Sequence, residues 1–357
     1  MIDMKKMTLR KTLDVSSGLV VLISWICFNL IQYPAQADSS ALMNQAKTAN
    51  SERYQFAVSN GAEISATKDN KAFSIWWQPA ITKPTAVIVT LHGHASYATD
   101  EFYLWQNYAA KRNFAILALQ WWFGGGEAVN DYYAPQDMYP IIADILMAKA
   151  IRPGEVLLHG FSRGSANSYA IAALDSFSGN RFFSMVLSNS GSAAADFPPN
   201  RQIESGFFGS KPFSGIQWAL FCGDKDPEPN INGCPAMKKT QDWIIKYGAT
   251  IAIFLEDPNS GHGGFHMNPN NVETVLAKFS PINRYADVDK ILDWAEKKYS
   301  VSLFPSSISQ LGYGYYYRCY SGDICVGAKN DELYLYQKGQ IQALDSTSNY
   351  LSVMLKP

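Results

Sequence analysis

The sequence lacks a surplus of charge of either sign. Its 30 Lys and Arg residues stand against 31 Asp and Glu residues, the formal net charge is -1, and no long basic run occurs. Proteins that bind nucleic acid need a concentrated positive surface to neutralise phosphates. We therefore expect no nucleic-acid partner. The 47% of hydrophobic and 17% of charged residues are instead typical of a globular chain with a large core.

The sequence also lacks an apolar run long enough to cross a membrane. The best candidate runs from about Gly18 to Ile31, is interrupted by Asn29, and falls short of the roughly 20 residues that a spanning helix needs. Basic residues precede it, and the tripeptide Ala35-Gln36-Ala37 follows it. This order is typical of a cleaved secretory signal peptide rather than of an uncleaved anchor. We predict a signal peptide over residues 1–37 and an exported chain, periplasmic or secreted, with no stable membrane insertion after cleavage.

Cysteine is scarce, with five residues in the chain. Cys27 belongs to the predicted signal peptide, which leaves an even set of four in a chain bound for an oxidising compartment. Such a set favours disulfides over metal binding or thiol catalysis. Four cysteines allow three pairings. We expect the two local ones, Cys222 with Cys234 and Cys319 with Cys325.

Histidine is equally scarce, again with five residues. His262 and His266 are four apart, which is the spacing of a helical zinc-binding pair. However, Gly263, Gly264 and Phe265 stand between them, with no glutamate and poor helix propensity. We therefore expect neither a metal nor another cofactor.

Hydrophobic patterning predicts an α/β domain over residues 51–300. Residues 38–50 before it are mostly polar or small and are expected to form a mobile leader. Two extended stretches at 54–58 and 73–78 come first, and then residues 86–91 form a run that is apolar on both faces, as a covered central strand requires. From there to about residue 255 strand and helix patterns alternate, which indicates βαβ units. The predicted architecture is a mostly parallel sheet with helices on both faces.

Two further features of the chain stand apart from this alternation. Residues 189–216 form an insertion that could serve as a modest lid. Residues 301–357 are rich in aromatic residues with short-period patterning, as in Leu333-Tyr334-Leu335-Tyr336. This texture predicts a small antiparallel β extension at the C-terminus.

The pentapeptide Gly160-Phe161-Ser162-Arg163-Gly164 is the strongest candidate for chemistry. It directly follows the predicted strand 155–159 and directly precedes the predicted helix 164–174. A Gly-x-Ser-x-Gly motif in this context forms a strained strand-to-helix turn that exposes the serine, with glycines where a side chain would clash. We therefore expect Ser162 to be a nucleophile.

A serine hydroxyl needs a base, and the base needs an acid to orient it. His262 lies in a glycine-rich loop after the last predicted strand and is the expected base, with His266 as the alternative. The acid is expected between serine and histidine, at a strand end. Asp226 fits this place, and Asp224 is its rival.

The remaining site residues follow from the same plan. The developing oxyanion needs two main-chain N–H groups, which we expect from Arg163, directly after the nucleophile, and from His94, in the loop after strand 86–91. Trp121 and Trp122 follow another strand end and are expected to contribute to substrate binding, because ligands lie beyond the carboxyl ends of parallel strands.

Four motifs in this order resemble the α/β-hydrolase superfamily, namely Leu91-His92-Gly93, Gly160 to Gly164, Gly223 to Asp226 and Gly261-His262-Gly263. More narrowly, they resemble secreted bacterial esterases of the polyhydroxybutyrate depolymerase and feruloyl esterase type. The resemblance covers about Phe73 to Phe279 and implies an eight-stranded sheet and acyl-enzyme chemistry. Arg163 departs from it, because small or amide side chains are frequent at that position.

The expected activity is hydrolysis of a carboxylic ester, in a small molecule or a polymer, through the set Ser162, His262 and Asp226. The same set also serves serine peptidases and amidases, which remain an alternative. A catalytically silent binding protein of the same fold is the other alternative.

Overall fold

The computed structural model describes residues 38–80, 83–194, 197–282 and five short strands between 308 and 346. The predicted signal peptide, its cleavage site and residues 283–300 of the predicted domain lie outside the described residues. Within the described part of the chain, no helix combines the length and the apolar character that crossing a membrane requires.

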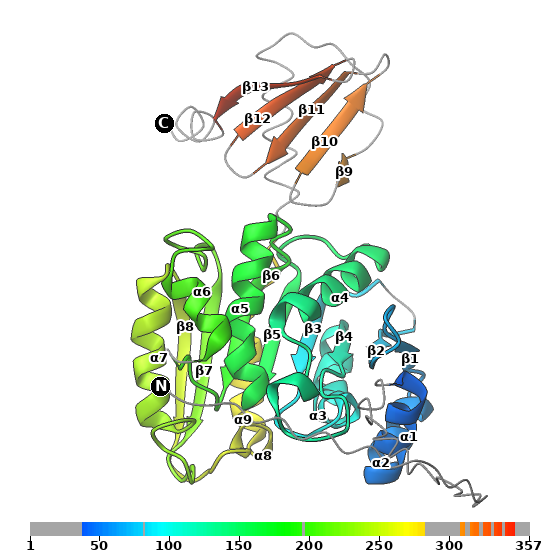
Figure 1. The fold of residues 1–357 in the computed structure, drawn as a ribbon, viewed down its shortest axis with the longest axis vertical. Helices are drawn as coiled ribbons and strands as arrows, with labels where there is room; N and C mark the ends of the chain where they lie inside the picture. The colour runs from blue at the N-terminus through cyan, green and yellow to red at the C-terminus, as the bar shows by residue number, and fades with distance from the viewer. Residues whose placement is uncertain are drawn as a thin grey trace, which may run out of the picture. The chain divides into compact units, whose positions relative to one another are not determined.

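Eight strands form one sheet in the order β1-β2-β4-β3-β5-β6-β7-β8 (Figure 1). Their bounds are β1 (Glu63–Ala66), β2 (Phe73–Trp77), β3 (Ala86–Leu91), β4 (Phe114–Leu119), β5 (Val156–Phe161), β6 (Phe183–Asn189), β7 (Gln217–Gly223) and β8 (Thr250–Asp257). β2 runs antiparallel to β1 and β4, whereas all pairs from β4 through β8 are parallel. Every residue of β3 and β4 is buried, as expected of strands covered on both faces.

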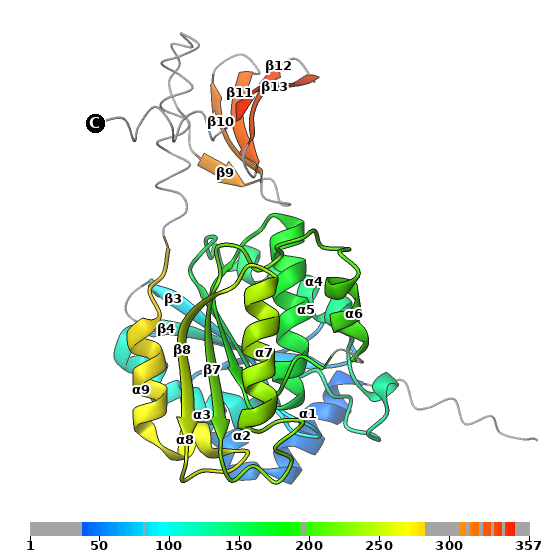
Figure 2. The same ribbon diagram turned by 90° about the vertical axis from the view of Figure 1, so that its left-hand side faces the viewer.

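Helices cover both faces of this sheet, as the alternating pattern predicts. Figure 2 shows α9 on one face and α5 and α7 on the other. The helices that follow strands are α3 (Ala98–Arg112), α4 (Pro135–Ala148), α5 (Arg163–Ser178), α7 (Cys234–Lys246) and α9 (Pro269–Lys278). The shorter α6 (Pro198–Glu204) lies in the predicted lid insertion, and α8 (Gly264–Met267) follows the glycine-rich loop.

The segment predicted as a mobile leader is instead helical. α1 (Ser39–Ala49) follows Asp38, whose carboxylate accepts the Ser40 main-chain N–H at 3.0 Å, and α2 (Ser51–Ser59) follows Asn50. Leu42 and Ala46, one helical turn apart, are 2% and 0% exposed and belong to the hydrophobic core. The prediction fails because two well-placed apolar residues and two caps suffice for a packed helix in a mostly polar segment. The prediction of an extended stretch at 54–58 is also wrong, because these residues lie in α2.

The C-terminal strands form an antiparallel sheet, as predicted. They are β9 (Ile308–Gln310), β10 (Tyr315–Tyr320), β11 (Ile324–Lys329), β12 (Glu332–Gln337) and β13 (Gln340–Ser346), in the order β13-β12-β11-β10-β9. The backbone register pairs Cys319 with Cys325 across β10 and β11. The side chains of this sheet, and with them the predicted bond between these cysteines, lie outside the described residues.

Candidate active site

The turn between β5 and α5 exposes Ser162 in a strained conformation. Its φ is 54° and its ψ is -118°, a region that side-chain-bearing residues rarely adopt. A Cβ added to Gly160 would come 2.4 Å from the carbonyl oxygen of Gly164, and one on Gly164 would come 2.4 Å from that of Leu91. Both contacts are with backbone, so neither position accepts a side chain. The Ser162 main-chain N–H donates to the Asn189 carbonyl at 2.8 Å, which ties the turn to the end of β6.

Three residues far apart in the sequence meet in a chain of hydrogen bonds at this turn. His262 Nε2 lies 2.8 Å from Ser162 Oγ, and His262 Nδ1 lies 2.7 Å from Asp226 Oδ2. Asp226 is 5% exposed and follows β7, whereas His262 lies in the loop after β8. With the ring proton on Nδ1, His262 donates a hydrogen bond to the Asp226 carboxylate, and its Nε2 accepts a hydrogen bond from the serine hydroxyl.

The two alternatives considered from the sequence lie elsewhere. Asp224 is exposed, and its main-chain N–H donates to the Asp257 carbonyl at 3.0 Å. His266 is half-buried and packs among aromatic rings, with its ring centroid 4.8 Å from that of Trp105. Burial lowers the pKa of His266 from 6.5 to about 3, which leaves its ring neutral near pH 7. The structure therefore brings together Asp226 and His262, and not their rivals.

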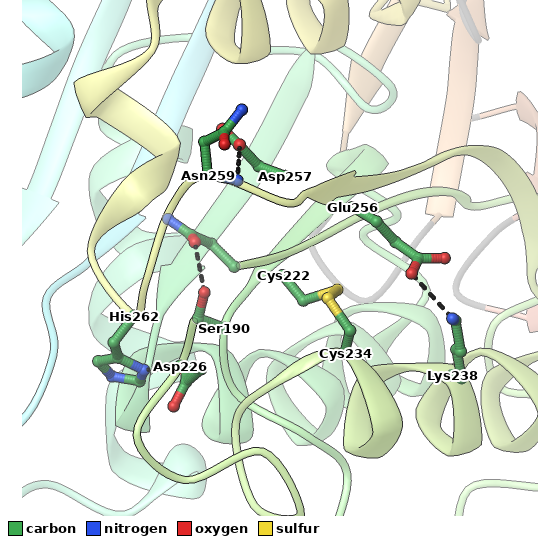
Figure 3. The surroundings of a disulfide bond; sticks show 10 residues. Ser190, Cys222, Asp226, Cys234, Lys238, Glu256, Asp257, Asn259 and His262 are labelled. Atoms are coloured by element: carbon green, nitrogen blue, oxygen red, sulfur yellow. Dashed lines mark hydrogen bonds and ion pairs between the residues drawn. A yellow bond between two sulfur atoms is a disulfide. The ribbon is translucent and has the colours of Figure 1, made fainter. Parts of the chain in front are cut away.

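A disulfide joins Cys222, the penultimate residue of β7, to Cys234, the first residue of α7 (Figure 3). This is one of the two predicted pairs. The loop that it closes contains Asp226, whose Oδ1 also accepts the Glu228 main-chain N–H at 2.9 Å. The covalent link and this hydrogen bond both restrict where the carboxylate can lie.

The loop after β3 passes close to Ser162. A Cβ on Gly93 would lie 3.4 Å from Ser162 Cβ, so the backbone next to His94 passes within contact of the serine. The buried His92 holds this loop: its Nδ1 donates to the Gly93 carbonyl at 2.8 Å, and its Nε2 accepts the Trp121 main-chain N–H at 3.3 Å. Burial lowers the pKa of His92 to about 4, which keeps the imidazole neutral for both roles.

A buried polar cluster under the turn was not predicted from the sequence. Thr90 Oγ1 donates to Glu101 Oε2 at 2.7 Å, and His159 Nδ1 lies 3.3 Å from the same oxygen. The Trp105 indole nitrogen lies 3.1 Å from His159 Nδ1, and the Asn189 amide nitrogen lies 3.2 Å from His159 Nε2.

The net charge of this cluster depends on the protonation state of Glu101. Burial raises the pKa of Glu101, but the hydrogen bond and charge of His159 outweigh it and leave the pKa below its ordinary value. The main-chain carbonyl of Asn189 accepts the Ser162 N–H, so Asn189 connects this cluster to the turn that carries Ser162. A glutamate on the inner face of a helix was the one signal that could have revealed it.

A cavity of about 290 Å³ is lined by Arg163, the residue directly after Ser162, whereas Ser162, Asp226 and His262 do not themselves line it. Its aromatic walls come from Trp121, Tyr132, Tyr133 and Phe197. The predicted Trp122 is not among its lining residues; its indole N–H donates to the Gly126 carbonyl at 2.9 Å. A larger cavity of about 420 Å³ lies between β1, β2 and α4, and none of Ser162, Asp226 and His262 lines it.

The strand order, the strained serine after β5, the acid after β7 and the histidine after β8 together match one known architecture. The chain has the α/β-hydrolase fold. No protein-family model matches it, and no curated protein matches its sequence.

Similar solved structures include a putative dienelactone hydrolase from Klebsiella pneumoniae subsp. pneumoniae MGH 78578, at 12% identity and a TM-score of 0.48, covering 61% of this chain and 97% of that one. Fungal esterases from Rhizomucor miehei are similar at 11% identity and a TM-score of 0.46, with 66% and 88% covered. A predicted CIB-like hydrolase from Thermoplasma acidophilum follows at 15% identity and a TM-score of 0.43, with 61% and 97% covered. At such identities the similarity concerns the fold.

Proposed function

We propose that the protein is a serine hydrolase that cleaves carboxylic esters through an acyl-enzyme. The observation that carries this proposal is the hydrogen-bonded order Ser162 Oγ, His262 Nε2, His262 Nδ1, Asp226 Oδ2. A serine on a strained turn, an imidazole within reach and a buried carboxylate behind it are what nucleophilic catalysis by serine needs.

In the first step, Ser162 Oγ attacks the ester carbonyl carbon while His262 Nε2 takes the hydroxyl proton. Asp226 stabilises the imidazolium that forms. When the tetrahedral intermediate collapses, the alcohol leaves with the proton of His262, and the acyl group stays on Ser162. Water then gives a proton to His262 and attacks the acyl carbon, which releases the carboxylic acid and returns the proton to Ser162 Oγ.

The oxyanion of each tetrahedral intermediate needs donors that are fixed before the reaction. We assign this role to the main-chain N–H groups of Arg163 and His94. Arg163 begins α5, whose first N–H groups have no partner within the helix. The loop of His94 is held against the serine by His92 and Gly93, which supports the second assignment.

The test is hydrolysis of p-nitrophenyl acetate by wild type and by Ser162→Ala. The variant should lose at least about 10³-fold in kcat, because removing the nucleophile leaves only binding and oxyanion stabilisation. Ser205→Ala, which changes an exposed serine after α6, serves as the matched control. A folded Ser162→Ala variant with wild-type turnover would contradict the proposal.

Acetyl, feruloyl and long-chain esters and a peptide anilide then separate the alternatives. Faster cleavage of the anilide than of any ester would favour a peptidase or amidase. No cleavage of any of them by folded protein would favour a binding protein.

We also propose that the protein is exported after removal of residues 1–37. The N-terminal pattern and the Cys222–Cys234 disulfide support this, since disulfides persist in oxidising compartments. Sequencing the N-terminus of the mature protein should find Asp38 first. A mature chain that retains residues 1–37 would contradict this proposal.

A further inference from the structure

Arg163 is a cation directly after Ser162, and it has no carboxylate partner among the residues that the structure describes. Its guanidinium Cζ lies 4.3 Å from the centre of the Tyr132 ring, and Nη1 makes a long hydrogen bond of 3.4 Å to the Glu127 main-chain oxygen. Within residues 38–80, 83–194 and 197–282, no carboxylate oxygen lies within ion-pair distance of it. The Glu127 carboxylate instead lies 3.7 Å from His94 Nε2.

Three other arginines of the same domain form ion pairs with carboxylates. Arg53 pairs with Asp100 at 3.0 Å, Arg152 with Glu155, and Arg112 with Glu273. Arg163 therefore stands out among the described arginines, because it combines partial burial with a ring contact and no counter-charge.

The contact with Tyr132 determines which part of the guanidinium remains available. A guanidinium is planar and carries five N–H donors in its plane, so an aromatic ring against its face leaves the donors at its edges free. Those donors match the two oxygens of a carboxylate, which they bind in a bidentate manner. The contact with the Tyr132 ring positions the guanidinium and uses none of its N–H donors, of which Nη1 alone makes the long hydrogen bond to the Glu127 main-chain oxygen.

The cavity beside Arg163 has the size and lining for a small planar group. Its volume of about 290 Å³ lies near the lower end for ligand pockets. Trp121, Tyr132, Tyr133 and Phe197 supply ring surface along its walls. Two further lining residues are hydrogen-bonded to each other: Gln136 Nε2 of α4 donates to Gln202 Oε1 of α6 at 3.2 Å. This hydrogen bond connects the helices on either side of the cavity.

We propose that this cavity is a substrate subsite for a compact aromatic or otherwise planar group that carries a carboxylate, with Arg163 binding the carboxylate. The substrate class that follows is an ester with a free acidic group close to the scissile bond, such as the half-ester of a dicarboxylic acid. This inference rests on the proposed ester hydrolysis, because it describes what the same site accepts. A carboxylate on the substrate would also explain why position 163 carries an arginine, where the esterases that the sequence resembles frequently have a small or amide side chain.

Binding can be measured apart from catalysis by using the Ser162→Ala protein. Ligand-observed NMR titrations with benzoate and with its neutral isostere benzamide compare the same ring with and without the charge. Benzoate should bind at least about 10-fold more tightly, because hydrogen bonds to charged groups are stronger than neutral ones. Arg163→Gln in the same background should remove that preference, and Arg163→Lys should retain part of it. Arg201→Gln, an exposed arginine in α6, removes the same charge outside the cavity and should keep the preference.

A kinetic comparison then tests the substrate class. Wild type should hydrolyse monomethyl terephthalate with a higher kcat/KM than methyl 4-acetylbenzoate, and Arg163→Gln should lower that ratio at least about 10-fold through KM, as loss of a charged hydrogen bond implies. Equal binding of benzoate and benzamide, or an unchanged ratio in Arg163→Gln, would overturn the inference. If those results occur while p-nitrophenyl acetate is still cleaved in a Ser162-dependent way, the carboxylate subsite is wrong and the proposed ester hydrolysis stands. If benzoate binds as described but no ester is cleaved, the proposed ester hydrolysis is wrong and the carboxylate subsite stands.

Discussion

Acidification should destabilise the fold through His266, whose ring the structure holds neutral among aromatic side chains. Burial, and after it the nearby His159, lower the pKa of His266 to about 3. In the unfolded chain the same imidazole binds a proton near pH 6.5. Between pH 6.5 and about 3 the unfolded state therefore binds more protons than the folded state. The stabilising contribution of neutral His266 is fully present above pH 6.5 and is lost as the pH falls through this window.

The size of the effect at pH 5 follows from these two pKa values. At that pH the protonated imidazole of the unfolded chain is about 30 times as abundant as the neutral one, whereas the folded imidazole stays neutral. This difference lowers the free energy of unfolding by roughly 2 kcal/mol. At pH 7.5 the same comparison gives only about 0.1 kcal/mol. His266→Phe should remove this dependence, because Phe keeps a ring against Trp105 and the Nε2 atom that it deletes has no hydrogen-bond partner among the described residues.

The assay is urea unfolding of wild type and His266→Phe at pH 7.5 and pH 5.0. Wild type should lose about 2 kcal/mol more unfolding free energy between the two pH values than the variant does. His92 is present in both proteins, so its own acid sensitivity cancels in the difference. Equal losses in the two proteins would refute the reasoning, because they would mean that His266 does not remain neutral in the folded state.

Three other substitutions test separate parts of the account. Asp226→Asn should lower kcat for p-nitrophenyl acetate about 10³- to 10⁴-fold, since the imidazole loses its orienting carboxylate, whereas Asp224→Asn should stay near wild type. Replacing Cys222 and Cys234 together with Ser should lower the unfolding free energy by about 3 kcal/mol in a urea titration, the entropy of the short loop that the bond closes. Leu42→Ala should cost about 2 to 3 kcal/mol in the same titration, because Leu42 is buried in the core; no change would mean that α1 does not pack there.

The sheet and the nucleophile turn could be predicted because their signals are local. A fully apolar run such as residues 86–91 fits a covered strand, and the Gly-x-Ser-x-Gly pattern lies directly between a strand pattern and a helix pattern. Gly160 is required by a contact with Gly164 only four residues further on. His262 and Asp226 could be selected because few histidines compete and because parallel strands end at one edge of the sheet.

The rest depends on tertiary contacts that no local pattern encodes. The polar segment of α1 folds because Leu42 and Ala46 find a core, and its composition does not reveal that. Glu101 is buried because His159 and Thr90 come to it from two strands. Trp121 and Trp122 are neighbours in the sequence, yet Trp121 lines the cavity and Trp122 does not.

The proposed chemistry depends on Ser162 being a nucleophile that His262 activates. Labelling of the folded, full-length protein with a fluorophosphonate probe, followed by mass spectrometry of the digested adduct, tests it most directly. We expect one adduct, on Ser162, which forms in wild type, forms much more slowly in His262→Gln and is absent in Ser162→Ala. An adduct on another residue, or equally fast labelling in His262→Gln, would contradict it.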